Sequence, residues 1–269
     1  MSKKATKYVA KVPDASGYIP YTAEEHETWN ILITKQRPIA QRYACDEWLE
    51  ACDRMRFPTD RIPQCTEISK VLQAHTGWSV YPCAALINFD DFFKLLANKQ
   101  FPAASFIRSR DELEYLQEPD IFHEIFGHTP LLTDQRFAEF THIYGQLGLK
   151  ADSKDRKYLA RLYWFTVEFG LLKQRGEFKT YGAGIVSSMG ETPYSIDSAK
   201  ADRRRFVPLD VLRTPYRIDI FQTVYYWIES LDELYAVAHT DVMALVEDAK
   251  RLGMFEPTYP PATKKVSWA

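Results

Sequence analysis

EPDIFHEIFGHTPLLTD, residues 118–134, is the stretch of this 269-residue chain from which its architecture can be worked out. It contains two histidines, His123 and His128, five positions apart. On an ideal α-helix five residues rotate the chain by about 500°, which leaves two such side chains about 140° apart. The two imidazoles can therefore face one point only if the helix ends or distorts between them. Gly127 and Pro130 are typical of a helix end and favour that arrangement.

A carboxylate that would complete a metal site with this pair occurs further along the chain. Glu168 lies in RLYWFTVEFGLL, residues 161–172, between apolar neighbours and with no Lys or Arg three or four positions away. A carboxylate in such surroundings needs a cation, supplied either by a distant salt bridge or by a metal ion. Two imidazoles and one carboxylate are the facial triad of non-haem Fe(II) oxygenases. We therefore predict an iron site on these three residues.

Two other interpretations stay open from these residues alone. His123 and His128 could be ordinary histidines, one in the core and one at a helix end. The same ligand types also occur in zinc hydrolases. The zinc motif H-E-x-x-H, however, spaces its histidines four apart on one face of a helix, so the five-residue spacing argues against that class.

The composition is that of an ordinary globular protein, with 46% hydrophobic and 26% charged residues. The formal net charge of −2 gives no electrostatic reason to expect nucleic acid or an anionic membrane surface as a partner. The sequence has no run of the roughly 20 apolar residues that span a bilayer, and its basic start has no apolar segment of a secretory signal behind it. The four cysteines form no CxxC pair, which favours free thiols. We therefore expect a cytoplasmic protein.

The spacing of apolar residues predicts a mostly helical chain. Helices are expected from Thr22, around Trp48 and after Pro63, and then over 90–98, 119–128, 134–149, 155–175, 217–237 and 241–250. Short strands are expected at 78–81 and 104–108, whereas the glycine-containing stretch 181–191 is not expected to be regular helix. The predicted fold class is mainly α with a small β element, in one catalytic domain over residues 21–256. Residues 1–20 are expected to form an extended arm, and residues 257–269 a proline-rich tail.

Several blocks of the sequence together resemble the catalytic domain of the aromatic amino acid hydroxylase family, most closely its bacterial members. These blocks are YTAEEHETWNIL (21–32), DRIPQCTEISKVL (60–72), EPDIFHEIFGHTPLLTD (118–134), YWFTVEFGL (163–171) and YGAGIVSSMGE (181–191). The resemblance covers about residues 21–256 and implies the single-domain catalytic fold of that family. It extends to neither a regulatory domain nor an oligomerisation helix, so we expect a monomer or a small homo-oligomer.

The resemblance implies a pterin-dependent non-haem iron monooxygenase with Fe(II) on His123, His128 and Glu168. Its substrates would be L-phenylalanine, dioxygen and a tetrahydropterin, either tetrahydrobiopterin or a related bacterial pterin, which supplies two electrons. One oxygen atom would enter the aromatic ring to give L-tyrosine, and the other would leave on the pterin. The alternatives are the same chemistry on L-tryptophan or L-tyrosine, and a binding module that keeps the fold without the activity.

The resemblance also implies which side chains surround the two organic molecules. Around the pterin it places Phe92 stacked on the ring, Glu124 at its edge, and Ala85, Ile87, Phe89 and Tyr226 nearby. Around the amino acid it places Arg108 at the carboxylate, Ser187 and Glu191 at the same end, Trp164 and Phe169 at the ring, and Tyr163 close to the iron as a catalytic residue. Without the resemblance, Phe92 is an ordinary core aromatic, Glu124 a solvated helix residue and Arg108 a partner in a surface salt bridge.

Overall fold

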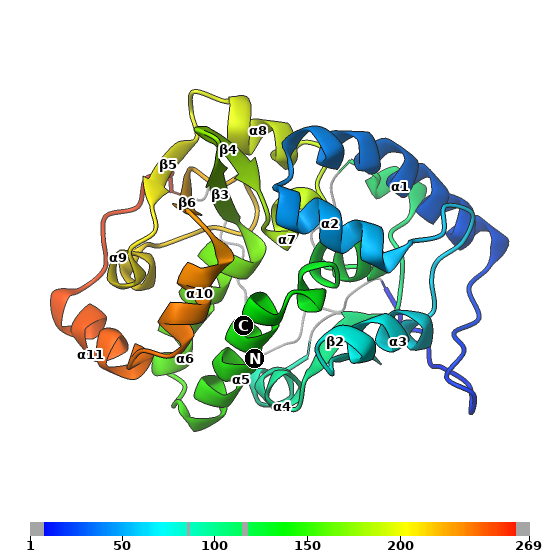
Figure 1. Ribbon diagram of the computed structural model, residues 1–269, viewed down its shortest axis with the longest axis horizontal. Helices are drawn as coiled ribbons and strands as arrows, with labels where there is room; N and C mark the ends of the chain where they lie inside the picture. The colour runs from blue at the N-terminus through cyan, green and yellow to red at the C-terminus, as the bar shows by residue number, and fades with distance from the viewer. Residues whose placement is uncertain (1–7, 85–86, 115–117, 262–269) are drawn as a thin grey trace.

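The computed structural model describes residues 8–84, 87–114 and 118–261, and most of these are helical (Figure 1). The α-helices are α1 (Ala23–Tyr43), α2 (Asp46–Met55), α3 (Cys65–His75), α4 (Phe89–Ala97), α5 (Gln135–Lys150), α6 (Asp155–Tyr163), α7 (Ala183–Val186), α8 (Glu191–Asp197), α9 (Pro208–Arg213), α10 (Leu231–Ala238) and α11 (Val242–Leu252). Two π-helices, His123–His128 and Trp164–Glu168, and two 3₁₀ turns, Arg110–Glu112 and Leu131–Thr133, complete the helical part. The predicted class, mainly α with a small β element, is confirmed.

The larger of two sheets has the strand order β4-β3-β6-β5. Its strands are β3 (Gly170–Gln174), β4 (Glu177–Thr180), β5 (Asp202–Arg205) and β6 (Val224–Ile228). β3 and β4 form an antiparallel hairpin, whereas β6 pairs in parallel with both β3 and β5. The hairpin turns at Arg175 and Gly176, which have φ values of 52° and 84°. Two positive φ values at a two-residue turn match the right-handed twist of the strands.

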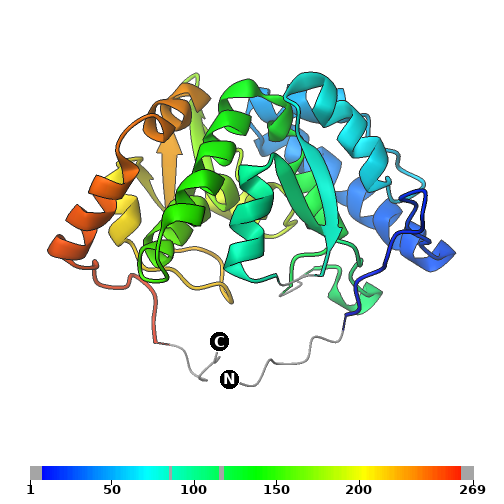
Figure 2. The same cartoon turned by 90° about the horizontal axis from the view of Figure 1, so that it is seen from below.

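The smaller sheet pairs β1 (Ser79–Cys83) with β2 (Gln100–Ala104) in parallel, and α4 makes the crossover between them. Helix α5 packs against α4 on one side and α10 on the other, so it joins the two halves of the molecule. In Figure 1 the larger sheet with α9 and α11 lies on the left, and α1 to α3 lie on the right. Figure 2, seen from below, shows α5 running between the two halves.

The segment that carries the two histidines is fixed in the core by aromatic side chains. Phe122 and Phe126 stack on each other with ring centroids 5.0 Å apart. Trp29 of α1 meets the edge of Phe122, and Trp48 of α2 meets that of Phe126. All four rings are almost completely buried. Burial of large aromatic rings contributes most of the stabilisation in such a cluster, so α1 and α2 hold this segment in place.

Two of the predicted helices are wrong in part. The helix expected over 155–175 ends at Glu168, and the chain continues as the buried strand β3. The helix expected over 217–237 is replaced at Val224–Ile228 by β6, and only α10 at its end is helical. Both strands are short and lie in the centre of a sheet that is partly parallel; β6 is a continuous apolar and aromatic run, and β3 begins with the buried residues Gly170–Leu172. Such runs have neither helical nor alternating periodicity, which is why their spacing was misleading.

Smaller differences concern element ends. The strand expected at 104–108 lies earlier, at Gln100–Ala104, and the helical turns expected from residue 119 begin at Ile121. The stretch 181–191 contains the single helical turn α7. The capping box predicted at Thr22 is present, because Thr22 Oγ1 accepts from the Glu25 N–H and the Glu25 carboxylate accepts from the Thr22 N–H.

The described parts of both terminal segments contact the body of the protein. Near the N-terminus, the Ile19 N–H donates to Gln64 Oε1 at 2.7 Å. At the other end, Tyr259 Oη donates to the carbonyl oxygen of Tyr216 at 3.2 Å, and Arg217 donates to that of Pro260 at 3.0 Å. All four cysteines are free thiols. No helix in the described ranges is long and apolar enough to cross a bilayer.

Candidate metal centre

The helix that carries His123 and His128 is widened between the two histidines, and this brings their side chains together in spite of the five-residue spacing. Residues His123–His128 form one π-helical turn, in which backbone hydrogen bonds join residues five apart rather than four. Two side chains five positions apart therefore come to the same side. The two imidazoles are perpendicular, and their Nε2 atoms lie 3.1 Å from each other. The distortion predicted between the two histidines is thus a π-helical turn, which contains one residue more than an α-helical turn.

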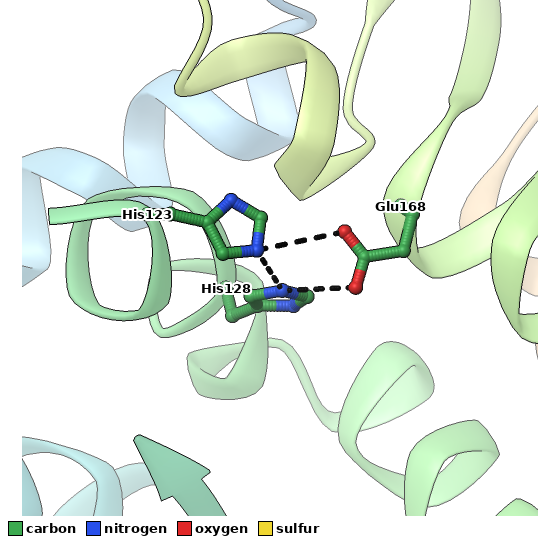
Figure 3. Close-up of side chains that lie close together, drawn as sticks. All are labelled: His123, His128 and Glu168. Carbon is green, nitrogen blue, oxygen red and sulfur yellow. Dashed lines mark hydrogen bonds and ion pairs between the residues drawn. The ribbon is translucent and has the colours of Figure 1, made fainter. Parts of the chain in front are cut away.

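Glu168 reaches the same point from the end of the second π-helix, Trp164–Glu168. Its Oε1 lies 3.2 Å from His128 Nε2, and its Oε2 lies 3.7 Å from His123 Nε2 (Figure 3). One ligand atom from each of the three residues lies within 4.8 Å of the others. The backbone behind Glu168 is packed too closely for a side chain at Gly182, where a Cβ atom would lie 2.4 Å from the Glu168 carbonyl oxygen. The close packing restrains the main chain at Glu168.

The charges at this point suit a cation. Burial lowers the pKa of His123 to about 4, so its imidazole is neutral at physiological pH. Burial alone would raise the pKa of Glu168, but the neighbouring His128 and His123 lower it overall, so the group is a carboxylate. Ser187 Oγ accepts the Nδ1 proton of His123, which leaves the Nε2 lone pair facing the carboxylate. Lone pairs and a negative charge that face one another fit a divalent metal ion.

The three candidate ligands lie at the wall of a cavity of about 490 Å³. All but two of the other predicted site residues also line it: Ile87, Phe89, Phe92, Arg108, Glu124, Tyr163, Trp164, Phe169, Ser187 and Glu191. Ala85 lies outside the residues that the structure describes. A volume of this size suits two small ring molecules beside a metal.

Comparison with known proteins agrees with this geometry. The family model described as "Biopterin-dependent aromatic amino acid hydroxylase" matches residues 1–268. The chain belongs to this family. It is 53% identical to "Phenylalanine-4-hydroxylase" of Pseudomonas aeruginosa over 96% of this chain and 98% of that protein. The corresponding values for the Vibrio cholerae protein of the same name are 51%, 97% and 90%.

Solved structures of the family have the same fold. The apo structure of the cold-active phenylalanine hydroxylase from Colwellia psychrerythraea 34H has a TM-score of 0.91 and 51% identity, and the match covers 93% of this chain and 97% of that one. The Chromobacterium violaceum phenylalanine hydroxylase with bound Fe(III) has a TM-score of 0.86 and 39% identity, with 91% and 89% covered. The predicted hydroxylase fold is therefore confirmed.

One residue assigned to the pterin side of this hydroxylase lies elsewhere. Tyr226 belongs to β6, where its hydroxyl group pairs with Thr214 at 2.7 Å and its ring meets the edge of Phe165. It is not one of the residues that line the cavity, so the geometry gives no support to its predicted role beside the pterin. Tyr216, which was not predicted, does line the cavity, where it stacks on Trp164 with centroids 4.4 Å apart. Sequence analysis missed Tyr216 because the helix expected just after it gave no sign of a cavity wall.

Arg108 of the hydroxylase is buried and already paired. Its Nε and Nη2 atoms donate to the two carboxylate oxygens of Asp120 at 2.8 and 2.9 Å. Asp120 also accepts from the His123 N–H, so it connects Arg108 to the first residue of the π-helix. The pair is internal and not the surface salt bridge of the alternative interpretation. Because Asp120 accepts from Nε and Nη2 of the guanidinium group, Nη1 remains to donate to a substrate carboxylate.

Two carboxyl groups in the cavity are held in apolar surroundings. Burial, followed by the charge of Glu168, raises the pKa of Glu124 well above its usual value. Burial raises the pKa of Glu191 to about 7, although it accepts from the Gln222 N–H at 2.9 Å and Tyr225 Oη at 2.7 Å. Burial therefore favours the protonated form of Glu124, which can donate a hydrogen bond, whereas the pKa of Glu191 lies near neutral pH.

Proposed function

We propose that this chain is a pterin-dependent, non-haem iron monooxygenase that hydroxylates L-phenylalanine to L-tyrosine with dioxygen and a tetrahydropterin. The observation that carries the proposal is the convergence of His123, His128 and Glu168 on a cavity with two aromatic sides. The choice of L-phenylalanine is supported by identity above 50% to phenylalanine-4-hydroxylases over nearly the whole chain. Three ligand groups that converge at the wall of a cavity are what an open, three-ligand iron site requires.

In this proposal the two imidazole Nε2 atoms and the Glu168 carboxylate would hold Fe(II) at the wall of the cavity. The bound iron, with two electrons from the tetrahydropterin, supplies the activation of dioxygen. Ser187 keeps the proton of His123 on Nδ1 and so keeps Nε2 available for the metal. Tyr163, which is five positions before Glu168, lies beside His128 and closes the cavity near the metal.

We infer that the pterin would bind on the side formed by α4 and the segment before it. Phe92 would stack on the pterin ring, and Tyr163 meets the edge of Phe92 with centroids 5.5 Å apart. Ile87 and Phe89 extend the same apolar wall. In its protonated form, which burial favours, the Glu124 carboxyl group would donate a hydrogen bond to the pterin edge, a role that a carboxylate could not fill.

We infer that the amino acid would bind at the part of the cavity wall that Trp164 and Phe169 form. Trp164 and Phe169, with centroids 4.5 Å apart, would wall its aromatic ring. Arg108 would meet its carboxylate through Nη1, and Ser187 and Glu191, which also line the cavity, would contact the same end of the molecule. The negative charge that Glu191 acquires near pH 7 would favour the ammonium group of the substrate.

The direct test is tyrosine formation by Fe(II)-loaded protein with a synthetic tetrahydropterin. We expect one tyrosine for each pterin oxidised, and faster turnover of L-phenylalanine than of L-tryptophan or L-tyrosine in competition. Absence of a pterin-dependent product from all three amino acids would overturn the proposal. Metal analysis of protein isolated without added metal separates it from a zinc hydrolase, because iron is expected to predominate. Activity with zinc in place of iron would contradict the iron assignment.

We further propose that the protein is cytoplasmic and forms a monomer or a small homo-oligomer, with residues 21–256 as the catalytic domain. The free thiols support a reducing compartment. Light scattering coupled to size-exclusion chromatography measures the mass in solution. A mass of four chains or more would contradict the expected state.

A further inference from the structure

A buried glutamine in the cavity wall, Gln222, is bonded through every part of its amide. Its side chain is 4% exposed. Its Oε1 accepts from the indole N–H of Trp164 at 3.1 Å, and its Nε2 donates to the carbonyl oxygens of Arg217 and Ile220 at 2.8 and 3.2 Å. The two carbonyl groups can be satisfied only by the NH₂ end of the amide. Oxygen must therefore face the indole, and the orientation of the amide is determined.

The partner of this amide, Trp164, is part of the cavity wall on the amino-acid side. Its ring lies between Tyr216, with centroids 4.4 Å apart, and Phe169, with centroids 4.5 Å apart. Stacking restrains the tilt of the indole, but an indole can still turn within such a stack. Its single polar atom points to Gln222, so this hydrogen bond sets how the indole is turned in its own plane.

The main chain of Gln222 links the same wall to the other end of the amino-acid site. Its N–H donates to Glu191 Oε1 at 2.9 Å, and Tyr225 Oη donates to the same oxygen. Gln222 therefore touches both the residue proposed for the substrate ring and the residue proposed for the substrate ammonium. A shift of this one residue would move both ends of the site together.

We propose that Gln222 is the positioning residue that fixes the orientation of Trp164. Through Trp164 it sets the width of the slot, the part of the cavity beside Trp164 and Phe169 that would hold the aromatic ring of L-phenylalanine. The inference rests on the proposed hydroxylation of L-phenylalanine. Without the amide, the indole N–H and two loop carbonyl groups lose their buried partners, and the indole can turn. A wider slot holds phenylalanine less tightly and excludes the larger indole ring of L-tryptophan less strictly.

The variants separate the two ends of the amide. Gln222→Met keeps the length of the side chain and removes all its hydrogen bonds. Gln222→Glu keeps an acceptor for the indole but no donor for the loop carbonyl groups. Trp164→Phe keeps an aromatic wall without an N–H. Gln73→Met on the exposed face of α3 is the matched control.

We expect Gln222→Met to raise KM for L-phenylalanine by about fivefold, as the loss of the buried hydrogen bond to the Trp164 indole predicts, with a smaller change in kcat and unchanged iron content. The KM ratio of L-tryptophan to L-phenylalanine should fall. In Gln222→Glu, which keeps an acceptor for the indole N–H, both KM and the KM ratio should stay closer to the wild-type values than in Gln222→Met. In the Trp164→Phe background, Gln222→Met should alter KM by less than about twofold, because residues that act through one contact are not additive.

An independent measurement does not need turnover. The six tryptophans each give one indole N–H signal in a nitrogen–proton NMR spectrum of the full-length, metal-free protein. The signal absent from Trp164→Phe belongs to Trp164. It should move in Gln222→Met and stay near its place in Gln222→Glu and Gln73→Met.

Two results would overturn the inference: a Trp164 signal that does not respond to Gln222→Met, or an equal KM change in both backgrounds. Failure of the proposed function would look different. In that case wild-type protein would make no tyrosine, while the NMR signal would still report whether Gln222 holds the indole.

Discussion

Ser187 and His123 are hydrogen-bonded on the side of the imidazole that points away from the candidate metal position. Ser187 Oγ lies 2.9 Å from His123 Nδ1 and donates its own proton to the Ala183 carbonyl oxygen at 2.7 Å. Because that proton is already used, the hydroxyl group can only accept from the imidazole. The serine therefore determines both the tautomer and the orientation of one proposed ligand.

Replacement of Ser187 by alanine is expected to weaken iron binding without loss of the fold. Removal of a group that orients a metal ligand typically lowers metal affinity by about 10- to 100-fold. Competition with a chelator measures the Fe(II) affinity, and Ser153→Ala, at an exposed position, is the control. Equal affinity in Ser187→Ala and wild type would show that the imidazole is oriented by other contacts.

Glu168→Ala is expected to abolish iron binding and turnover while the metal-free protein stays folded. The carboxylate supplies the only negative charge of the proposed triad, and its side chain is 15% exposed, so its removal leaves no large void. Iron content and thermal unfolding of the metal-free form should be measured together. Glu177→Ala on β4, with an exposed side chain, should match wild type in both. Wild-type iron content in Glu168→Ala would remove Glu168 from the ligand set.

The raised pKa of Glu191 predicts a pH-dependent stability. Folding raises the pKa of this carboxyl group from 4.5 to about 7 because the group is buried. Between these values the folded chain keeps a proton that the unfolded chain has lost, so stability falls as pH rises. Relative to Glu191→Gln, wild type should lose roughly 2 to 3 kcal/mol of unfolding free energy between pH 5 and pH 8.

Urea unfolding of the metal-free protein across this pH range measures the difference. The amide that Glu191→Gln introduces still offers an oxygen to Tyr225 and Gln222, so the comparison isolates the charge. Glu177→Gln, with an exposed carboxyl group, should follow wild type. A constant difference between wild type and Glu191→Gln at all pH values would refute the buried titration.

The C-terminal segment is expected to tune the amino-acid side of the cavity. Tyr259 and Pro260 bond to Tyr216 and Arg217, which belong to the loop that walls this side. A chain truncated after residue 256 should fold but show a KM for L-phenylalanine raised by about threefold, the effect of one or two exposed hydrogen bonds. Truncation after residue 261 keeps these contacts and is the control. Identical KM values for the two chains would contradict this role.

Elements with a clear helical period and end signals could be predicted from the sequence. Helix α5 matches the expected 134–149 closely, because Asp134 caps its N-terminus and apolar residues recur along one face. β3 and β6 could not be recognised in the same way. Each is buried by neighbours that come from distant parts of the chain, and that tertiary environment decides between helix and strand for a short apolar run.

The composition of the site was more predictable than its geometry. The ligand set followed from the types of residue and from an apolar stretch around Glu168 with no nearby cation. The π-helical turns did not, because a pattern based on 3.6 residues per turn contains no term for an inserted residue. Gln222 was missed for another reason. Its function depends on partners such as Trp164, far away in sequence, and a single buried amide leaves no signature in the chain.

The widened turn at His123–His128 also makes the number of residues part of the ligand geometry. Deletion of one residue between the histidines would restore an α-helix and give the four-residue spacing of zinc proteins. Insertion of one residue would turn His128 away from Glu168. Length changes that a surface loop absorbs easily are therefore more harmful here than most single substitutions. Over evolutionary time this segment should vary in side chains and stay constant in length.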